Sequence, residues 1–278
     1  MSRGAHPRAC LAALLFAVAG AGRALADEAP FPGGAAAYWL EKDGSPLWTH
    51  DADRALPPAS LTKLMTALLF VESGVPLSTS VRVSEGAAHE TGSRLGLRAG
   101  EEMSAGDLLA ATLVASANDA CVALASQVAG SEASFVTAMN RRARELGLAH
   151  THFANACGHD APEHRSSVRD LAVLAKAALR EAPIASLVRL VTRRVATRGG
   201  RHWKLENKNE IVGRYAGAVG VKSGFTPAAG KCLIALAERN GATVLLVVLN
   251  APNRWWDSVA LLDRAFALSP PVPSQRVQ

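Results

Sequence analysis

The chain has 278 residues, of which 49% are hydrophobic and 19% are charged, and 30 basic and 24 acidic residues give it a formal net charge of +6. The basic residues form no long run, which argues against nucleic acid as a partner. The length suits one large domain, or two interleaved lobes, with an ample core.

Residues 1–26 have the features of a signal peptide. Arg3 and Arg8 give a positive start, residues 11–19 are apolar, and Ala-Leu-Ala at residues 24–26 is a small-residue cleavage site. The apolar run is shorter than the about 20 residues that a membrane-spanning helix needs. We therefore predict export to the periplasm or beyond. The mature chain would begin near Asp27 with a net charge of +3 (27 minus 24).

Three cysteines remain after this cleavage: Cys121, Cys157 and Cys232. An odd number allows at most one disulfide and leaves one free thiol. The tendency of cysteine to be buried favours three separate thiols. Cys157, His159 and His164 match no zinc-binding spacing. We therefore predict neither a metal nor a cofactor.

The N-terminal half begins with a predicted hairpin. Residues 35–41 are apolar and lead to Asp43-Gly44, a type I′ turn signal, after which residues 46–50 can return as a second strand. From Ser60, apolar residues recur every three or four positions, which predicts a helix that ends at Gly74. Capping signals predict further helices at residues 104–114, 119–128, 131–146 and 166–178.

The C-terminal third changes to strand patterns. Aliphatic and β-branched segments predict strands at residues 187–195, 219–223, 231–237 and 243–249. A closing helix is expected at residues 255–268, with Trp255 and Trp256 anchoring it to the sheet. We therefore predict an α+β fold, in which N- and C-terminal strands share an antiparallel sheet flanked by helices, with an inserted all-helical lobe. The proline-rich tail at residues 269–278 is predicted to be disordered.

Ser-Leu-Thr-Lys at residues 60–63 is the first candidate for chemistry. Residues three apart on a helix share one face, so Ser60 and Lys63 should point together into a cleft. A serine hydroxyl becomes a good nucleophile when a neutral amine takes its proton, and burial or a second cation lowers a lysine pKa. Taken alone, the pair also fits a helix N-cap and a solvated lysine.

Ser-Ala-Asn at residues 116–118 lies between two predicted helices. The Ser116 hydroxyl can pass a proton to a leaving amine, and the Asn118 amide can hold a substrate carbonyl together with Lys63. Taken alone, this segment is equally a helix break with Asn118 capping the next helix.

Lys-Ser-Gly at residues 222–224 ends a predicted strand. The strand can pair with an extended peptide, with Lys222 and Ser223 binding a substrate carboxylate and Gly224 allowing close approach. The Phe225 N–H is expected to complete an oxyanion hole with the Ser60 N–H. Taken alone, the segment is an exposed turn with a solvated lysine.

Together, in this order, the three segments form the motif set of penicillin-binding proteins and class A β-lactamases. The chain resembles the D-alanyl-D-alanine carboxypeptidases, serine peptidases also called low-molecular-mass penicillin-binding proteins. The likeness spans residues 35–266. It includes Pro-Pro-Ala before Ser60, Ser-Val-Arg-Asp-Leu-Ala at residues 167–172, and Gly-Val-Lys-Ser-Gly-Phe-Thr at residues 220–226.

The resemblance implies a transpeptidase-like catalytic domain at residues 27–268. It implies Ser60 as the acyl-enzyme nucleophile, Lys63 as its proton acceptor, Ser116 as the second active-site serine and Lys222 as a substrate-binding residue. The implied substrate is the peptidoglycan stem peptide that ends in D-Ala-D-Ala, and β-lactams would trap the same serine.

Two positions depart from the family pattern. Ser223 stands where the family usually has threonine, which keeps the hydroxyl but loses the β-methyl that stiffens χ1. His159 replaces an apolar residue in the loop at residues 155–160. The chain also ends where many relatives continue into a stalk domain and a membrane anchor, so we expect no membrane anchor here.

Three alternatives remain open. A DD-endopeptidase would cut peptidoglycan cross-links with the same site. A class A β-lactamase needs a carboxylate for deacylation, and Glu163 is the nearest acid but lacks the Glu-x-x-Leu-Asn context. A non-catalytic peptidoglycan-binding protein would not need the three intact motifs.

Overall fold

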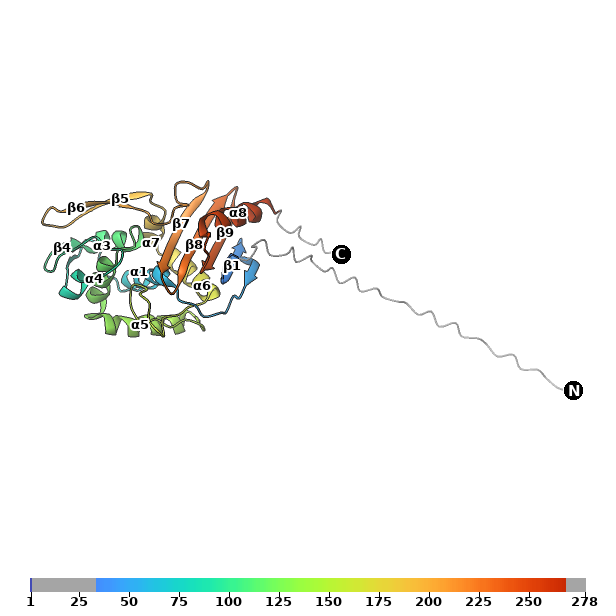
Figure 1. The fold of residues 1–278 in the computed structure, drawn as a ribbon, viewed down its shortest axis with the longest axis horizontal. Coiled ribbons are helices and arrows are strands. Elements are labelled where there is room, and N and C mark those ends of the chain that lie inside the picture. The colour runs from blue at the N-terminus through green and yellow to red at the C-terminus, as the bar shows by residue number, and fades with distance from the viewer. Residues whose placement is uncertain (2–33, 269–278) are drawn as a thin grey trace. The chain divides into compact units, whose positions relative to one another are not determined.

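The computed structural model describes Met1 and residues 34–268, so the rest of the predicted signal peptide and the predicted tail lie outside the described residues. Its centre is a five-stranded antiparallel sheet with the order β2-β1-β9-β8-β7 (Figure 1). The predicted α+β class, with one sheet shared by N- and C-terminal strands, is confirmed. The strands are β1 (Ala37–Lys42), β2 (Ser45–His50), β7 (Ala218–Thr226), β8 (Gly230–Arg239) and β9 (Ala242–Leu249).

The predicted hairpin joins β1 to β2. Asp43 and Gly44 have φ angles of 51° and 79°, and a type I′ turn requires positive φ at both central residues. Lys42 pairs with Ser45 across the turn.

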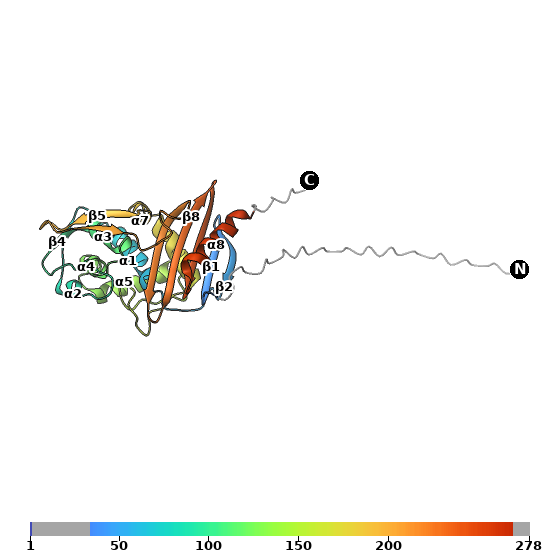
Figure 2. The ribbon, with the colours of Figure 1, turned by 45° about the horizontal axis from the view of Figure 1, so that its top comes forward.

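Both faces of the sheet are buried. Successive residues of β9 alternate between two apolar clusters, with Leu245 and Val247 in the larger cluster and Leu246 and Val248 in the smaller. The larger cluster contains the inner faces of the inserted helices, and the smaller contains helix α8 (Arg254–Ala267), which lies across the sheet in Figure 2. Burial on both sides explains why β9 is a continuous apolar run.

The segment between β2 and β7 forms the inserted lobe. It is mainly helical, but the prediction of an all-helical lobe is wrong, because the lobe also carries two short strand pairs, β3 with β4 and β5 with β6 (Figure 1). Of the described helices, none is long and apolar enough to cross a membrane. The elements are η1 (Ala59–Thr62), α1 (Lys63–Glu72), β3 (Ser80–Arg82), α2 (Glu85–Ala88), β4 (Glu102–Ser104), α3 (Ala105–Leu113), α4 (Asn118–Ala129), α5 (Glu132–Glu145), α6 (Val168–Leu179), α7 (Ala182–Val188), β5 (Thr192–Ala196) and β6 (His202–Glu206).

Three of the predicted helix starts are confirmed by capping hydrogen bonds. Ser104, Ser131 and Ser167 each accept a hydrogen bond on the side-chain oxygen from the backbone N–H three residues later. Such caps satisfy one of the donors that a helix N-terminus leaves unpaired.

The strand predicted at residues 187–195 is wrong in its first half. Residues 187 and 188 belong to α7, whose first turn contains Pro183, and the strand begins only at Thr192. A short aliphatic run does not by itself distinguish a buried helix turn from a strand. β5 also pairs with β6 in a separate ribbon, outside the central sheet.

The predicted anchoring role holds for one of the two tryptophans. Trp255 packs against the smaller apolar cluster, whereas the side chain of Trp256 is 81% exposed. Consecutive helical residues point about 100° apart, since a turn takes 3.6 residues, so both cannot face the sheet.

Truncation of the α8 core face should destabilise the fold. Leu262 is fully buried in the smaller cluster, so Leu262→Ala should lower the free energy of unfolding by about 2–5 kcal/mol. The matched change Trp256→Ala on the exposed face should shift it by no more than about 0.5 kcal/mol. Urea denaturation followed by circular dichroism measures both. Equal losses would contradict this packing.

Candidate active site

The first motif places a serine and a lysine in contact. Ser60 lies in η1, and Lys63 is the first residue of α1, so the first turn is a 3₁₀ turn. Lys63 Nζ lies 2.9 Å from Ser60 Oγ and donates to the Cys157 carbonyl oxygen at 2.6 Å. Ala59, directly before the serine, has a φ of 49°. Such backbone strain in a non-glycine residue is common at functional sites.

Lys63 is fully buried. Burial, and after it the positive charge of Lys222, hold the pKa of Lys63 well below its ordinary value, while Glu90 acts in the opposite direction. A lysine with a lowered pKa has a larger neutral fraction near neutral pH. A neutral amine at hydrogen-bond distance from a hydroxyl can take its proton as a nucleophile is formed.

The second and third motifs meet through one hydrogen bond. Ser116 lies in the predicted break between α3 and α4, with a φ of 60°. Its Oγ accepts a hydrogen bond from Lys222 Nζ at 2.8 Å, and Lys222 also donates to the Ser223 carbonyl at 2.9 Å. Burial, and then the charges of Arg254 and Lys208, lower the pKa of Lys222 to about 7. The pair can therefore shuttle a proton near neutral pH.

Asn118 is the first residue of α4 and binds the segment around Gly92. Its side-chain Nδ2 donates to the Thr91 carbonyl at 2.6 Å, and its backbone N–H donates to the Ser93 carbonyl at 2.7 Å. These bonds hold the segment around Gly92 against α4. The expected contact of the Asn118 amide with Lys63 and a substrate carbonyl stays a prediction.

The third motif passes close to Ser60. A Cβ atom at Gly224 would lie 3.0 Å from the Ser60 nitrogen and from the Ala59 Cβ, so glycine lets edge strand β7 approach η1. Ser223 Oγ donates to the Lys208 carbonyl at 2.8 Å. The Phe225 side chain is 61% exposed. The oxyanion role expected for the Phe225 N–H stays a prediction.

A cavity of about 270 Å³ opens beside the serine. Of the predicted site residues, Ser60, Asn118 and Phe225 line it, whereas Lys63, Ser116 and Lys222 are buried and do not belong to its lining. Its lining residues are Ser60, Gly92, Ser93, Asn118, Cys157, Gly158, His159, Asp160, Phe225, Thr226 and Pro227.

The loop at residues 155–160 lines one wall of this cavity. His159 Nε2 lies 2.8 Å from the Glu90 carboxylate. Asp160 accepts hydrogen bonds from the Thr226 hydroxyl and, at 3.2 Å, from the Ala228 N–H. The loop therefore connects the α2 side of the cavity to the end of β7.

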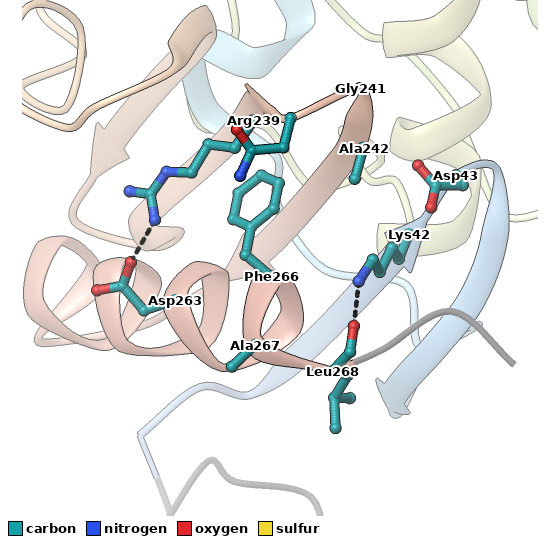
Figure 3. A pocket seen from close by; sticks show the side chains of 10 residues that line it. Lys42, Asp43, Arg239, Gly241, Ala242, Asp263, Phe266, Ala267 and Leu268 are labelled. Atoms are coloured by element: carbon teal, nitrogen blue, oxygen red, sulfur yellow. Dashed lines mark hydrogen bonds and ion pairs between the residues drawn. The ribbon is translucent and has the colours of Figure 1, made fainter.

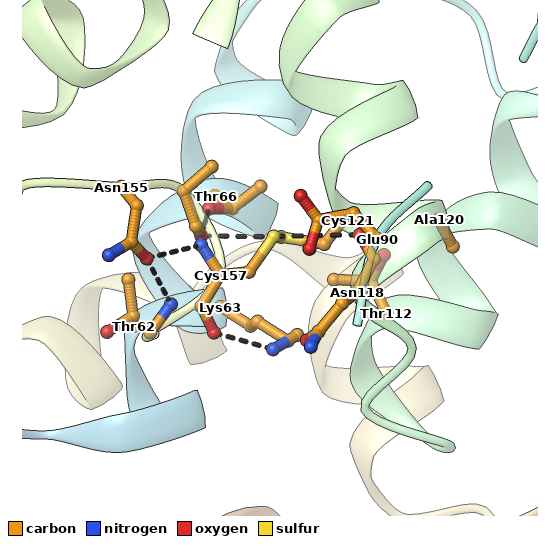
Figure 4. The surroundings of a disulfide bond; sticks show 12 residues. Thr62, Lys63, Thr66, Glu90, Thr112, Asn118, Ala120, Cys121, Asn155 and Cys157 are labelled. Atoms are coloured by element: carbon orange, nitrogen blue, oxygen red, sulfur yellow. Dashed lines mark hydrogen bonds between the residues drawn. A yellow bond between two sulfur atoms is a disulfide. The ribbon is translucent and has the colours of Figure 1, made fainter. Parts of the chain in front are cut away.

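The prediction of three separate thiols is wrong. Cys121 of α4 and Cys157 of this loop form a disulfide (Figure 4). A sequence cannot show which cysteines come within bonding distance when 36 residues separate them. Cys232 is the free thiol, and its burial raises its pKa to about 11.

Arg254 is a cation at the site that sequence reasoning missed. Its Nη1 donates to the Gly224 carbonyl at 2.5 Å and to the Cys232 carbonyl at 3.3 Å. Its guanidinium stacks over the Trp255 ring, 4.4 Å from the centroid. The only signal in the sequence was a basic residue at the start of the last predicted helix, which is common in any protein.

A larger pocket, of about 630 Å³, lies elsewhere, where Arg239 and Asp263 pair and Lys42 Nζ donates to the Leu268 carbonyl (Figure 3). Its lining residues include no serine, cysteine or histidine. The contact of the candidate nucleophile Ser60 with the candidate base Lys63 therefore favours the smaller cavity as the site.

A buried histidine supports the turn that carries the nucleophile. His164 Nδ1 accepts from the Ala154 N–H at 3.0 Å, so Nε2 carries the proton and donates to Thr62 Oγ1 at 2.8 Å. Thr62 Oγ1 in turn donates to the Ala59 carbonyl at 2.8 Å. This arrangement needs the neutral imidazole, and burial lowers the pKa of His164 to about 4.

Acid should weaken the fold through this histidine. Its pKa is about 4 in the folded chain and about 6.5 when unfolded, so between these values the unfolded chain binds more protons. The contribution of neutral His164 to the free energy of unfolding is complete above about pH 6.5. It falls by up to about 3 kcal/mol as the pH drops to 4. Urea denaturation at several pH values should show a shallower pH dependence in His164→Gln. The control His89→Gln, at an exposed histidine, should keep the slope of the parent.

The glycine at position 158 should be irreplaceable for the site. A Cβ there would collide with the Ala59 carbonyl, and a Cβ at Gly74 would touch nothing. Both glycines have positive φ, so alanine costs about 1–2 kcal/mol of conformational energy at either position. We expect Gly158→Ala to slow labelling of Ser60 by a fluorescent penicillin at least about tenfold, with Gly74→Ala unchanged. Equal labelling rates would contradict the packing of the loop on the nucleophile.

Comparisons with known proteins agree with this geometry. The model of the family described as D-alanyl-D-alanine carboxypeptidase matches residues 39–253. The D-alanyl-D-alanine carboxypeptidase DacF of Bacillus subtilis is 37% identical over 239 residues, which are 83% of this chain and 61% of the relative. A D-alanyl-D-alanine endopeptidase of Pseudomonas aeruginosa is 31% identical over 229 residues, 80% of this chain and 72% of the relative.

The solved structures give the same answer for the fold. The crystal structure of the Streptomyces K15 DD-transpeptidase superposes with a TM-score of 0.79 at 29% identity, and the match covers 84% of this chain and 98% of that one. The likeness therefore includes nearly all of that enzyme but only about three fifths of the Bacillus relative. From its three motifs, their convergence and the family match over residues 39–253, the chain belongs to the D-alanyl-D-alanine carboxypeptidase family of serine peptidases.

Proposed function

We propose that this chain is a serine D-Ala-D-Ala carboxypeptidase that removes the terminal D-alanine from peptidoglycan stem peptides. The observation that carries the proposal is the contact of a buried, pKa-lowered lysine with Ser60, because a base at this distance prepares a serine hydroxyl for acyl transfer. The family match supports the choice of D-alanyl-D-alanine as the substrate.

In the proposed reaction, the neutral Lys63 amine takes the Ser60 proton as Oγ attacks the carbonyl between the two D-alanines. The tetrahedral oxyanion would be held by the N–H groups of Ser60 and Phe225. Ser116, with Lys222 behind it, would pass a proton to the leaving D-alanine amine. Water then hydrolyses the acyl-enzyme, and a β-lactam in place of the peptide would remain on Ser60.

The substrate would bind as an added strand along β7. β7 is an edge strand of the sheet, and an edge offers unpaired backbone groups to an extended peptide. The Lys222 ammonium would hold the terminal carboxylate, and the Ser223 hydroxyl would join it by turning away from the Lys208 carbonyl. Asn118 would hold the acyl side of the peptide. Gly224 keeps the strand close enough to Ser60 for attack.

We further propose that residues 1–26 direct export to the periplasm, where the mature chain from Asp27 works. The N-terminal pattern supports this, and so does the Cys121–Cys157 disulfide, because such bonds persist in oxidising compartments.

The main alternative is a DD-endopeptidase that cuts cross-links with the same residues. The similarity to the D-alanyl-D-alanine endopeptidase of Pseudomonas aeruginosa supports this alternative. A class A β-lactamase is disfavoured, because Glu163 is paired with Arg165 on the surface, with its side chain 66% exposed.

The test offers diacetyl-Lys-D-Ala-D-Ala and purified cross-linked muropeptides to the mature protein. Free D-alanine from the tripeptide alone means a carboxypeptidase, and cleavage of the muropeptides means an endopeptidase. Ser60→Ala should abolish both reactions and the penicillin adduct. Lys63→Arg, which keeps a cation that cannot become neutral, should lower the rate by about 10²–10⁴-fold. No turnover of either substrate and no adduct would reject the proposal.

A further inference from the structure

The loop at residues 155–160 does more than line the cavity. Asn155 Oδ1 accepts hydrogen bonds from the N–H groups of Cys157, Gly158 and His159 at 2.7–3.2 Å, which folds the loop tightly. The fold turns the Cys157 carbonyl toward α1, where it accepts from Lys63 at 2.6 Å (Figure 4). This carbonyl thereby engages one N–H of Lys63, which restricts the direction of the amine.

The disulfide connects Cys157 to Cys121 of helix α4. Cys121 lies three residues after Asn118, one turn along α4. Cys157 Sγ also packs 3.6 Å from the Asn118 carbonyl. The bond therefore joins the loop that holds Lys63 to the helix that carries Asn118. Both cysteines are buried, with exposures of 0% and 1%.

We propose that the Cys121–Cys157 disulfide is a positioning element of the active site, which fixes the Cys157 carbonyl so that the Lys63 amine is aimed at Ser60. The oxidised chain would be the efficient form, and opening of the bond would weaken acylation. Neither cysteine touches the reacting atoms, so their effect passes through Lys63.

The physical reason is the way Lys63 is held. Lys63 reaches Ser60 at 2.9 Å and the Cys157 carbonyl at 2.6 Å. A cross-link that closes 36 residues of chain limits the positions open to that loop. Without it, the loop can move away from α4 and let water reach Lys63. Hydration favours the charged ammonium, so fewer molecules would carry the neutral base.

This inference rests on the proposed role of Lys63, and the experiment separates the two. Peptide mapping after thiol alkylation first tests for the Cys121–Cys157 bond in the purified mature protein. Acylation of Ser60 by a fluorescent penicillin is then followed against pH in that protein and in the double variant Cys121→Ser/Cys157→Ser. The single variant Cys232→Ala, at the free buried thiol, is the matched control.

We expect the double variant to acylate about 10- to 100-fold more slowly at neutral pH, as a small misplacement of a catalytic group does. The acid limb of its acylation rate against pH should move to higher pH, because better hydration of Lys63 raises the pKa of that amine. Cys232→Ala should retain the rate and the pH profile. Failure of the parent to acylate at all would reject the proposed function. If the double variant and the parent acylate at equal rates with equal acid limbs, the inference about the disulfide is overturned, and the proposed function is not. This holds even if the melting temperature of the double variant is lower.

A second arm does not depend on the folding of the variant. Dithiothreitol reduces the bond in the parent protein by two electrons and two protons to two thiols, and is itself oxidised to its cyclic disulfide. The rate should fall as the thiols appear and return on reoxidation, with circular dichroism unchanged. Full acylation with both thiols free, or absence of the bond in the purified protein, would overturn the inference.

Discussion

The site depends on the burial of two lysine side chains. Lys63 and Lys222 are 0% and 1% exposed, and neither forms an ion pair with a carboxylate of the described residues. Burying an unpaired ammonium is costly, and a lysine lowers that cost by losing its proton. Burial thus gives each lysine a larger neutral fraction, which suits the proposed role of a base, and each one lies next to a serine hydroxyl.

The rest of the fold is arranged so that this burial is possible. η1 lies against edge strand β7, where Gly224 permits the contact with Ser60. Helix α8 secures the same strand from its other side, because Arg254 donates to the Gly224 carbonyl. The central sheet, buried on both faces, supplies the edge strand against which Ser60 is held.

The loop at residues 155–160 makes further contacts that position the site residues. It contributes the carbonyl that binds Lys63, the glycine that packs on the Ala59 carbonyl and one half of the disulfide. Through His159 and Asp160 it also contacts both ends of the cavity. The contacts of Lys63 with the Cys157 carbonyl and of Gly158 with Ala59 involve backbone groups that every residue has, so these two contacts leave little signal in the sequence.

Local patterns in the sequence predicted the candidate site residues and most of the elements. Residue types at fixed local spacing, such as Ser60 with Lys63, indicate a candidate reaction and a helix turn, because local geometry follows from chain connectivity. The folded chain was needed to show that Cys121 and Cys157 bond, that Arg254 reaches the third motif, and that the strand beginning at Thr192 leaves the central sheet. Those outcomes depend on which distant segments pack together, and no local pattern encodes the distance between them.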